Sequence, residues 1–525
     1  MLRHPILPLP VLAACAAALA LALGGCATGP APVSPPVSAS GPVDPIRAAR
    51  WLDRVTWGAD AAALREFESL GPDAWLARQL HPPGRHEEAL PAAAVEQIAA
   101  MRIAQVSPED LARDMEARRK AADAIADPEE KKAAQNAWQQ ELNRLGREAA
   151  GRFLLRALYS PDQLREQMTW FWMNHFSVNQ YKGMIRAFVG DYEERAVRPH
   201  ALGKFVDLLR ATARHPAMLR YLDNDQNAAG HVNENFAREL LELHTLGVDG
   251  GYSQKDVQEL ARVLTGAGIS LATERPAVRK DLAAQYLREG LFEFNPNRHD
   301  AGAKVLLGQP VRGQGMSEID EALVRLARHP ATARNISRKL AVYFVTDDPS
   351  PALIGRLAAV FRDSDGDIAS VLAALFRSPE FAASLGAKFK DPVHYVVSAV
   401  RLAYDGRTIL NPGPMIGWIA RLGEPLYAHE TPDGFALTRA AWSSPGQMTV
   451  RFEIAKAIGS GSAGLFRPEG PGATDRPAFP QLATPVYYRA LQPGLAPDTR
   501  AALDQAVTPQ EWNLLLLASP EFMRR

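Results

Sequence analysis

Two carboxylates three residues apart are the most chemically suggestive feature of this chain. Glu239 and Glu242 lie in residues 223–247, which read DNDQNAAGHVNENFARELLELHTLG. On a helix this spacing places both side chains on one face, where they could act as acid and base or bind a cation. Asn235 and Arg238 share that face and are candidates for binding a substrate.

The same helix also allows a purely structural interpretation. Glu234 and Arg238 stand four residues apart, and so do Arg238 and Glu242. This is the spacing of ordinary ion pairs on a solvated helix face, which contribute little to stability. Both interpretations therefore stay open from the helix alone.

Two histidines are further candidates for chemistry. His175 follows the aromatic run Trp170–Trp172 and is a candidate catalytic residue or metal ligand, while His299 lies in a polar loop and is a second candidate ligand. The alternatives are a buried, hydrogen-bonded histidine for the first and a turn-stabilising one for the second. The remaining candidates for substrate binding are Asn174, Asp223, Asn224 and Asp300.

A capped helix must position the two carboxylates. Asp, Asn and Gly dominate residues 223–233, which predicts a loop, and Asn233 or Asn235 can cap the helix that follows it. Gly247 is typical of the residue just after a helix end. The apolar residues at helical spacing, which predict the buried face, are Phe236, Leu240 and Leu243.

Helical patterns continue through nearly the whole chain from residue 46, so we expect a mainly α protein. Residues 46–525 are predicted to form one large domain of packed helices, with N-terminal helices and a charged arm in 46–150 and the main body in 151–525. The exception is 291–307, where apolar residues alternate around an Asn-Pro turn. This pattern predicts a small β-hairpin with the His299-Asp300 pair on its loop.

Capping residues predict where several helices begin and end. Ser107 with Asp110, and Ser253 with Asp256, have the spacing of capping boxes. Gly146 is expected to end the helix of the charged arm.

Composition and charge argue against a nucleic-acid partner and against sites that need cysteine. The 525 residues are 47% apolar and 22% charged, which is typical of a globular protein. Lys plus Arg equal Asp plus Glu at 59 each, so no overall charge favours nucleic acid and we expect no such partner. The two cysteines are Cys15 and Cys26, so residues 27–525 hold no disulfide, cysteine nucleophile or thiolate metal site. A metal bound there would need His and carboxylate ligands.

The first residues predict export and lipidation. Residues 1–25 have the charged start and apolar run of a signal peptide, and Leu23-Gly24-Gly25-Cys26 resembles the lipobox of bacterial lipoproteins. Cys26 would then carry the lipid anchor to a membrane, and Ala27 after it suggests the outer membrane, facing the periplasm or the exterior. Residues 26–45 are rich in Pro and Ser and predict a tether. A plain secretory signal is the alternative.

Two segments resemble known ligand-binding motifs, but their surrounding sequence does not support that interpretation. The acidic run at 363–367, DSDGD, has its glycine at the fourth position and Ala374 at the twelfth, so it does not predict a calcium loop. Asp367 is expected to cap the next helix instead. The GxGxxG at 459–464 follows a helical pattern rather than a strand, so we expect no nucleotide cofactor. A divalent metal stays an open candidate.

Several motifs in order resemble the bacterial domain-of-unknown-function 1800 family, over about residues 46–522. They are WFWMNHF at 170–176, YLDN at 221–224, NENFARELLELHTLG at 233–247, RHDAG at 298–302, SRKL at 337–340 and two SPEF segments. The resemblance implies an exported protein, often encoded beside an exported protein of a family that resembles sulfatases and alkaline phosphatases. It implies no agreed reaction. The TGAG at 265–268 lacks the tryptophan expected after its first glycine, and the lipobox also departs from family members with other signals.

Two functions from different classes follow from these features. If the polar motifs converge in one cleft, the chain is a helical hydrolase that acts on envelope or extracellular polymers, with Glu239 or Glu242 as acid or base. Arg238 and Asn235 would then position the substrate, and the two histidines would bind a metal or carry protons. The alternative is a non-catalytic binding or assembly partner of the sulfatase-like protein, in which these residues form a buried polar network. Metal storage or delivery is a third interpretation.

Overall fold

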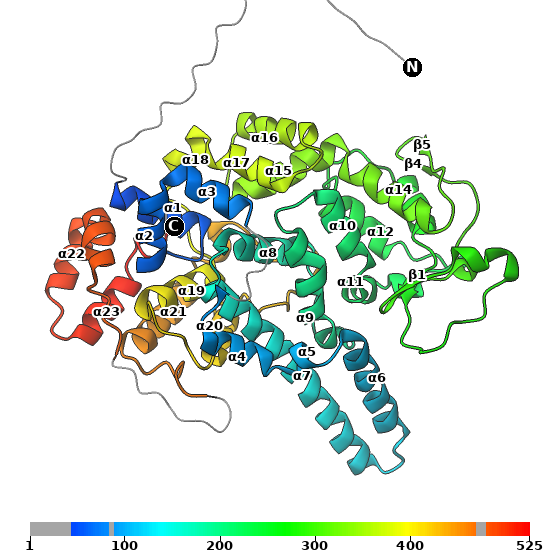
Figure 1. Ribbon diagram of the computed structural model, residues 1–525, viewed down its shortest axis with the longest axis horizontal. Helices are drawn as coiled ribbons and strands as arrows, with labels where there is room; N and C mark the ends of the chain where they lie inside the picture. Colours follow the sequence, from blue (N-terminus) through cyan, green and yellow to red (C-terminus); the bar gives the residue numbers. More distant parts are fainter. Residues whose placement is uncertain (1–43, 83–88, 469–478) are drawn as a thin grey trace, which may run out of the picture. The chain divides into compact units, whose positions relative to one another are not determined.

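The computed structural model describes residues 44–82, 89–468 and 479–525 (Figure 1). The predicted signal peptide, Cys26 and all but the end of the tether lie outside the described residues. The first helix begins at Pro45, capped by Asp44 through the N–H of Ile46. Within the described ranges, no helix combines the length and the apolar composition that crossing a bilayer requires.

Helices dominate the described chain, and the prediction of a mainly α protein is confirmed. The first are α1 (Pro45–Val55), α2 (Ala61–Leu70), α3 (Pro72–Leu80), α4 (Ala92–Ala99), α5 (Arg102–Gln105), α6 (Pro108–Ala124), α7 (Pro128–Tyr159) and α8 (Gln163–His175). The middle ones are α9 (Val189–Asp191), α10 (Phe205–Arg214), α11 (Pro216–Tyr221), α12 (Asn235–Glu239), α13 (Gln254–Val263), α14 (Met316–Ala327) and α15 (Pro330–Phe344). The last are α16 (Pro351–Asp363), α17 (Ile368–Phe376), α18 (Pro379–Ser384), α19 (Pro392–Ala403), α20 (Gly413–Arg421), α21 (Pro445–Gly459), α22 (Pro497–Asp504) and α23 (Pro509–Leu517).

Three helices form the centre of the core (Figure 1). α19 is buried along its whole length, and α8 and the second half of α7 are buried on nearly every side. Helices that are buried on every side must lie inside the protein, so the other helices pack around these three. α8 ends at His175, which places that residue within the core.

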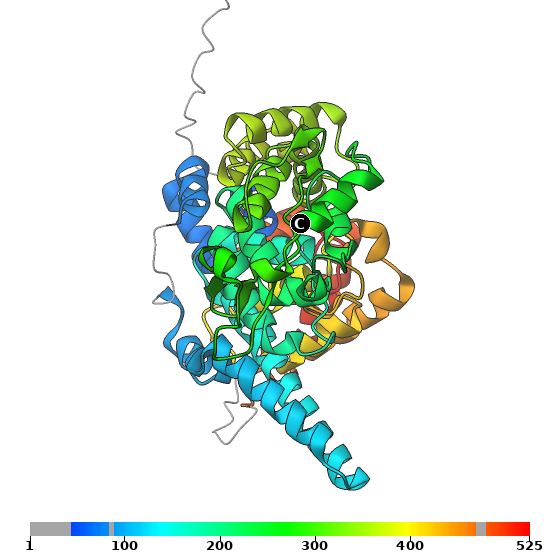
Figure 2. The ribbon, with the colours of Figure 1, turned by 90° about the vertical axis from the view of Figure 1, so that its right-hand side faces the viewer.

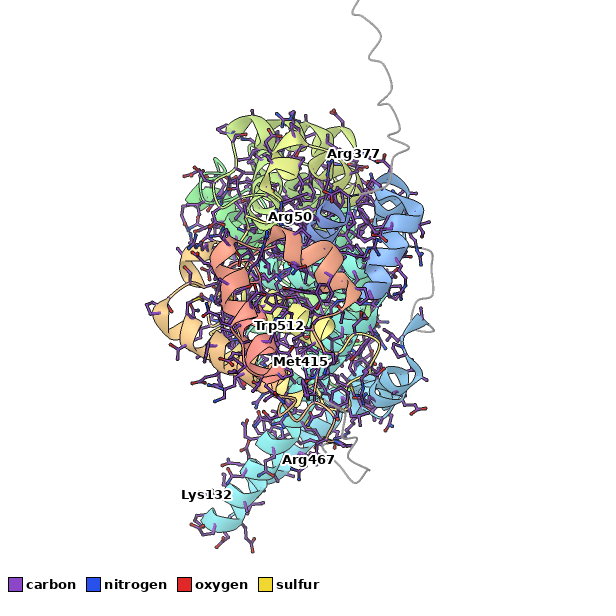
Figure 3. The ribbon with its side chains drawn as sticks, turned by 90° about the vertical axis from the view of Figure 1, so that its left-hand side faces the viewer. Arg50, Lys132, Arg377, Met415, Arg467 and Trp512 are labelled. Carbon is purple, nitrogen blue, oxygen red and sulfur yellow. The ribbon has the colours of Figure 1, made fainter. Side chains whose placement is uncertain are left out.

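The charged arm is an antiparallel pair of helices, α6 and α7, which pack against each other (Figure 2). Lys132 lies near its free end (Figure 3). Ser107 caps α6 as predicted, by accepting the N–H of Asp110 at 3.1 Å.

Gly146 does not end this helix, so that prediction is wrong. α7 continues through it to Tyr159. A side chain at position 146 would collide with the amide oxygen of Gln180. The glycine therefore permits a close approach between distant segments, which is a tertiary constraint that a local pattern does not reveal.

A small β region interrupts the helices, as predicted. β1 (Ala267–Ile269), β3 (Phe292–Phe294) and β2 (Leu287–Glu289) form an antiparallel sheet in that order, with Ala267 and Leu287 both opposite Phe294. β4 (Val305–Leu306) pairs with β5 (Gln309–Pro310). The β2–β3 hairpin turns at Gly290, whose φ is +58°. The predicted turn is therefore wrong: the Asn-Pro pair lies after β3, where it starts a 3-10 turn at Pro296–Arg298, and β3 and β4 do not pair with each other. His299 and Asp300 follow this 3-10 turn and do not lie on a hairpin loop.

Two other predicted caps are confirmed. Ser253 and Asp256 form the capping box of α13. Asp367 caps α17 by accepting the N–H of Ser370 at 2.9 Å. The GxGxxG segment begins at Gly459, the last residue of α21, which agrees with a helical rather than a strand context.

Candidate functional site

The helix that carries the two carboxylates is α-helical only in its first part. α12 ends at Glu239 and continues as a π segment, Leu240–His244. Asn233, one of the two predicted caps, accepts the N–H of Asn235 at 2.9 Å. The chain leaves the helix at Gly247, whose φ is +90°. The π turn was not predicted, and such turns occur often at functional sites.

Side chains from two other helices cap the carbonyl groups at the end of the π segment. Lys339 of α15 donates to the carbonyl oxygen of Leu243 at 3.2 Å, and His175 of α8 contacts that of His244 through Nε2 at 3.1 Å. Asn335, one turn before Lys339, donates to the carbonyl of Thr245 at 2.9 Å. The last carbonyls of a helix have no partner within it, so these contacts fix the π segment against α8 and α15.

His175 is a buried residue whose two ring nitrogens both make contacts within the protein. Its side chain is only 4% exposed, and Nδ1 lies 3.0 Å from Nζ of Lys339. Burial, and then the charge of Lys339, lower the pKa of His175 well below its usual value. The neighbouring His244 is fully buried, and burial lowers its pKa to about 3. Both imidazoles are therefore neutral at physiological pH.

Lys339 was missed in the sequence, although it stands in the SRKL motif. Its side chain is half-buried and forms no ion pair with a carboxylate among the described residues. Burial and the neighbouring Arg338 lower its pKa to about 8, against a smaller opposite effect of Asp433. The available signal was a lysine one turn after Asn335, within a helix rich in buried apolar residues.

Glu239 is a half-buried carboxyl that forms no ion pair within the described chain. Burial raises its pKa, and the negative charges of Glu242 and Asp433 raise it further, against the opposing charge of Arg238. Glu242 accepts a hydrogen bond from the hydroxyl of Tyr252 at 3.3 Å. The structure thus brings together the two predicted carboxylates, with the shift in pKa that an acid catalyst requires on Glu239.

Asp433 belongs to the same site and was also missed. Its side chain is 59% exposed, and its charge acts on Glu239, Lys339 and Tyr221. Asn174 holds this loop: its amide donates to the carbonyl of Phe435 at 2.9 Å and accepts the N–H of Phe435 at 2.6 Å. Asn174 therefore positions the loop of Asp433 through both ends of its amide.

Gly434 is the residue that lets the loop approach α8 so closely. Its φ is +74°, and a Cβ there would collide with the carbonyl oxygen of Asn174. We expect Gly434→Ala to lower the free energy of unfolding by about 2–3 kcal/mol, because it adds backbone strain and breaks the contact with Asn174. Urea unfolding measures this. Gly417→Ala is the control, because no atom lies within 4 Å of its added Cβ, and it should not destabilise the protein. Equal effects of the two variants would contradict the proposed close packing of the loop.

The other predicted binding residues around this helix make contacts within the protein. Asp223 has a left-handed backbone and forms an ion pair with Lys182 at 2.7 Å. Asn224 is buried and donates to the carbonyls of Leu264 and Ala267. The side-chain amide of Asn235 donates to the carbonyl of Leu222 at 3.3 Å, and Arg238 forms an ion pair with Glu234 at 3.0 Å.

His299 and Asp300 form a separate cluster. Nδ1 of His299 contacts the carbonyl of Thr265 at 2.8 Å, and its Nε2 lies 3.4 Å from Glu318. Asp300 forms an ion pair with Arg262 at 2.8 Å, and hydrogen bonds from this arginine lower its pKa to about 2. His175 and His299 share none of these partners. Across the ranges that the structure describes, no group of three or more His, Cys, Asp or Glu side chains is arranged to hold a metal.

Two well-formed hollows lie in other parts of the described chain. One, of about 570 Å³, lies at the base of the arm and is lined by residues of α4 to α7 together with Arg195. The other, of about 310 Å³, lies between α1 and the last residues of the chain, and Arg50, Phe522 and Arg525 are among the residues that line it.

Comparison with known protein families places nearly the whole chain in a family of unknown function. A family model described as "Protein of unknown function (DUF1800)" matches residues 50–524, nearly the whole chain. No curated protein matches, and no solved structure matches.

Proposed function

The chain belongs to the DUF1800 family, and since that family is described as one of unknown function, we propose from its own residues that it is an exported hydrolase of envelope or extracellular polymers. One observation carries the proposal. Glu239 is a half-buried carboxyl with a raised pKa and no ion pair in the described chain, and it stands beside a second carboxylate, Glu242. A carboxyl group with a raised pKa beside a second carboxylate can share the roles of acid and base with it in a hydrolase.

The two carboxyl groups have distinct roles in this proposal. Glu239 holds its proton at a higher pH than an ordinary glutamate and donates it to the leaving oxygen of the substrate. Glu242 is the base that takes a proton from the attacking water. Asp433 lies on an exposed loop at the same site and contacts the substrate. His175 and Asn174 position Lys339 and the Asp433 loop and do not touch the substrate.

The location of the protein is part of the proposal. We infer from the signal-peptide pattern at 1–25, the lipobox at Cys26 and the tether that a lipid anchor would hold the helical body at the outer membrane. The accessible substrates there are glycans and other polymers of the envelope or the exterior. The anchor is tested by growing cells that express the full-length chain with a radioactive fatty acid. The protein should become labelled, and the Cys26→Ala variant should not.

A substrate screen over a range of pH tests the reaction. We expect the purified full-length protein to turn over at least one polysaccharide or ester substrate. Turnover should be highest on the acidic side and should fall as the pH rises through the raised pKa of Glu239, because the acid must keep its proton. An activity that rises continuously with pH would contradict a role of Glu239 as acid.

The buried part of the cluster favours a second candidate. The ring nitrogens of His175 contact only Lys339 and the backbone, as in a sealed structural network. In this alternative the protein is a non-catalytic assembly partner of the exported sulfatase-like protein. Absence of turnover across the screen, together with binding of that partner by the purified chain, would favour this role over hydrolysis.

A further inference from the structure

The hollow of about 570 Å³ at the base of the arm has an apolar wall. Of the residues of α4, only Ala94 is buried. The large apolar side chains of this helix, Val95 and Ile98, line the hollow together with Ala99, at the spacing of one helix face. Val95 is 38% exposed. A helix normally turns such a stripe towards the core, so this wall is an apolar surface that the described residues leave partly uncovered.

The apolar wall continues beyond α4. Ile103 of α5, Val106, and Leu111 of α6 also line the hollow, and α5 packs against α7 where the arm joins the body (Figure 1). The volume lies in the range of pockets that bind small molecules, and contiguous apolar surface that is open to solvent marks binding sites. The wall therefore fits a ligand with an apolar part.

Another wall of the hollow holds a buried arginine with unused hydrogen-bond donors. Arg152 of α7 lines the hollow and is only 5% exposed. Its Nη2 donates to the carbonyl oxygen of Gly190, and its Nε lies 3.5 Å from Glu194 without a hydrogen bond. Among the described residues, no acceptor meets Nη1. Buried donors without an acceptor are unfavourable, so Nη1 is available for a ligand.

Two carboxyl groups lie near Arg152, and neither accepts a hydrogen bond from Nη1. Glu194 accepts hydrogen bonds from Arg156. Glu193 is buried and accepts a hydrogen bond from the hydroxyl of Tyr427, and burial raises its pKa. A carboxylate is a good ligand for a guanidinium group, because it is charged and has two acceptor oxygens. An anionic head group would therefore satisfy donors of Arg152 that the protein's own carboxyl groups do not.

We propose that this hollow binds a small amphiphile with a carboxylate head group and an alkyl chain. The carboxylate accepts hydrogen bonds from Nη1 of Arg152, and the alkyl chain lies on the apolar wall formed by α4 and α5. Asp191, another carboxylate that lines the hollow, pairs with Arg195 at 3.1 Å, so its charge is already compensated. The inference goes beyond the proposed hydrolysis and does not depend on it, since it involves neither Glu239 nor Glu242.

Photolabelling of the full-length protein shows where the alkyl chain binds. The probe is dodecanoate with a diazirine near the end of its chain, used without detergent and below the concentration at which it forms micelles. Peptide mass spectrometry then identifies the labelled residues. We expect saturable labelling within residues 92–111, which include the apolar wall. Labelling that does not saturate, or that falls mainly on residues 516–525 at the other hollow, would overturn the proposal.

Competition with unlabelled compounds identifies the head group. Dodecanoate should reduce the labelling at a concentration about tenfold lower than dodecanol, because a hydrogen bond between charged groups is stronger than one to a hydroxyl. Arg152→Gln should abolish this difference, whereas Arg144→Gln, at an exposed position of the same helix, should keep it. Equal competition by the acid and the alcohol in the unsubstituted protein would overturn the proposed head group, whether or not the variants fold.

A pair of variants on α4 tests the apolar wall. Ala99 is exposed and lines the hollow, so the side chain of Ala99→Phe would occupy the space of the alkyl chain without entering the core. The probe concentration for half-maximal labelling should rise at least about tenfold. Ala92→Phe, at the exposed start of the same helix, is the control and should label normally. Equal labelling of both variants would contradict binding on α4. These tests measure binding, so their failure would leave the role of Glu239 in hydrolysis open to its own test.

Discussion

Glu239→Gln is expected to lower polymer turnover by about 10²–10⁴-fold, the contribution that a positioned acid or base makes to a reaction. Glutamine keeps the size and shape of the side chain but cannot donate the proton. The loss should appear in kcat, since the proton is transferred in the transition state, with little change in KM. The fall of activity at higher pH should also disappear, because the group that causes it is gone.

The same substitution is not expected to weaken the fold. Burial makes the charged form of Glu239 unfavourable, so its pKa is raised in the folded state. A carboxyl with a raised pKa reduces stability as the pH rises through that value, and a neutral amide removes this cost. The melting temperature of Glu239→Gln at pH 7 should therefore be unchanged or higher. Glu234→Gln, five residues earlier at the start of α12, is the control and should keep full activity. Equal turnover by both variants would exclude Glu239 from the mechanism.

Arg156→Met is expected to lower the free energy of unfolding by about 2–4 kcal/mol, because it removes the nearest of the arginines that compensate the partly buried carboxylate of Glu194. The side chain of Arg156 is 2% exposed and forms an ion pair with Glu194. Burial alone would raise the pKa of Glu194, but the charges of Arg156 and Arg152 outweigh it and hold the value at about 2. Denaturant unfolding at pH 7 measures the loss.

The ion pair between Arg156 and Glu194 also predicts how the free energy of unfolding falls at low pH. A carboxyl with a lowered pKa contributes stability above its unfolded value, near 4.5, and loses it as the pH falls towards 2. The shift corresponds to about 3 kcal/mol, and Glu194→Gln should remove this part of the acid sensitivity. Arg144→Met is the matched control, since Arg144 lies on the same helix, is 50% exposed and pairs with Glu141. It should cost less than about 1 kcal/mol, and an equal cost for both arginines would contradict the buried pair.

Local patterns were enough to predict the helical class and many helix starts. Ser253 and Asp367 act through backbone groups only three residues away, so their spacing in the sequence carries the information. The family resemblance likewise rested on continuous motifs, and the match to residues 50–524 confirms it.

Features that depend on distant segments were not predictable in this way. The predicted end of α7 was wrong because Gly146 makes room for the side chain of Gln180, which packs against it from a distant segment. Asp433 lies between Pro432 and Gly434, residues typical of a turn, and Asn174 fixes its position from across the chain. For Lys339 the decisive facts are its burial and its acceptors on another helix, neither of which appears in the order of the residues.

The π segment at Leu240–His244 also bears on how this site could arise or be lost. A π turn is an α-helical turn with one residue inserted, so deletion of a single codon within it would restore a regular helix. Every later side chain would then rotate by about 100° about the helix axis. The carbonyl groups that now meet α8 and α15 would turn away from them. Homologues that are one residue shorter here should therefore have lost the lysine and histidine contacts together, which makes the length of this helix a simple marker for the intact arrangement.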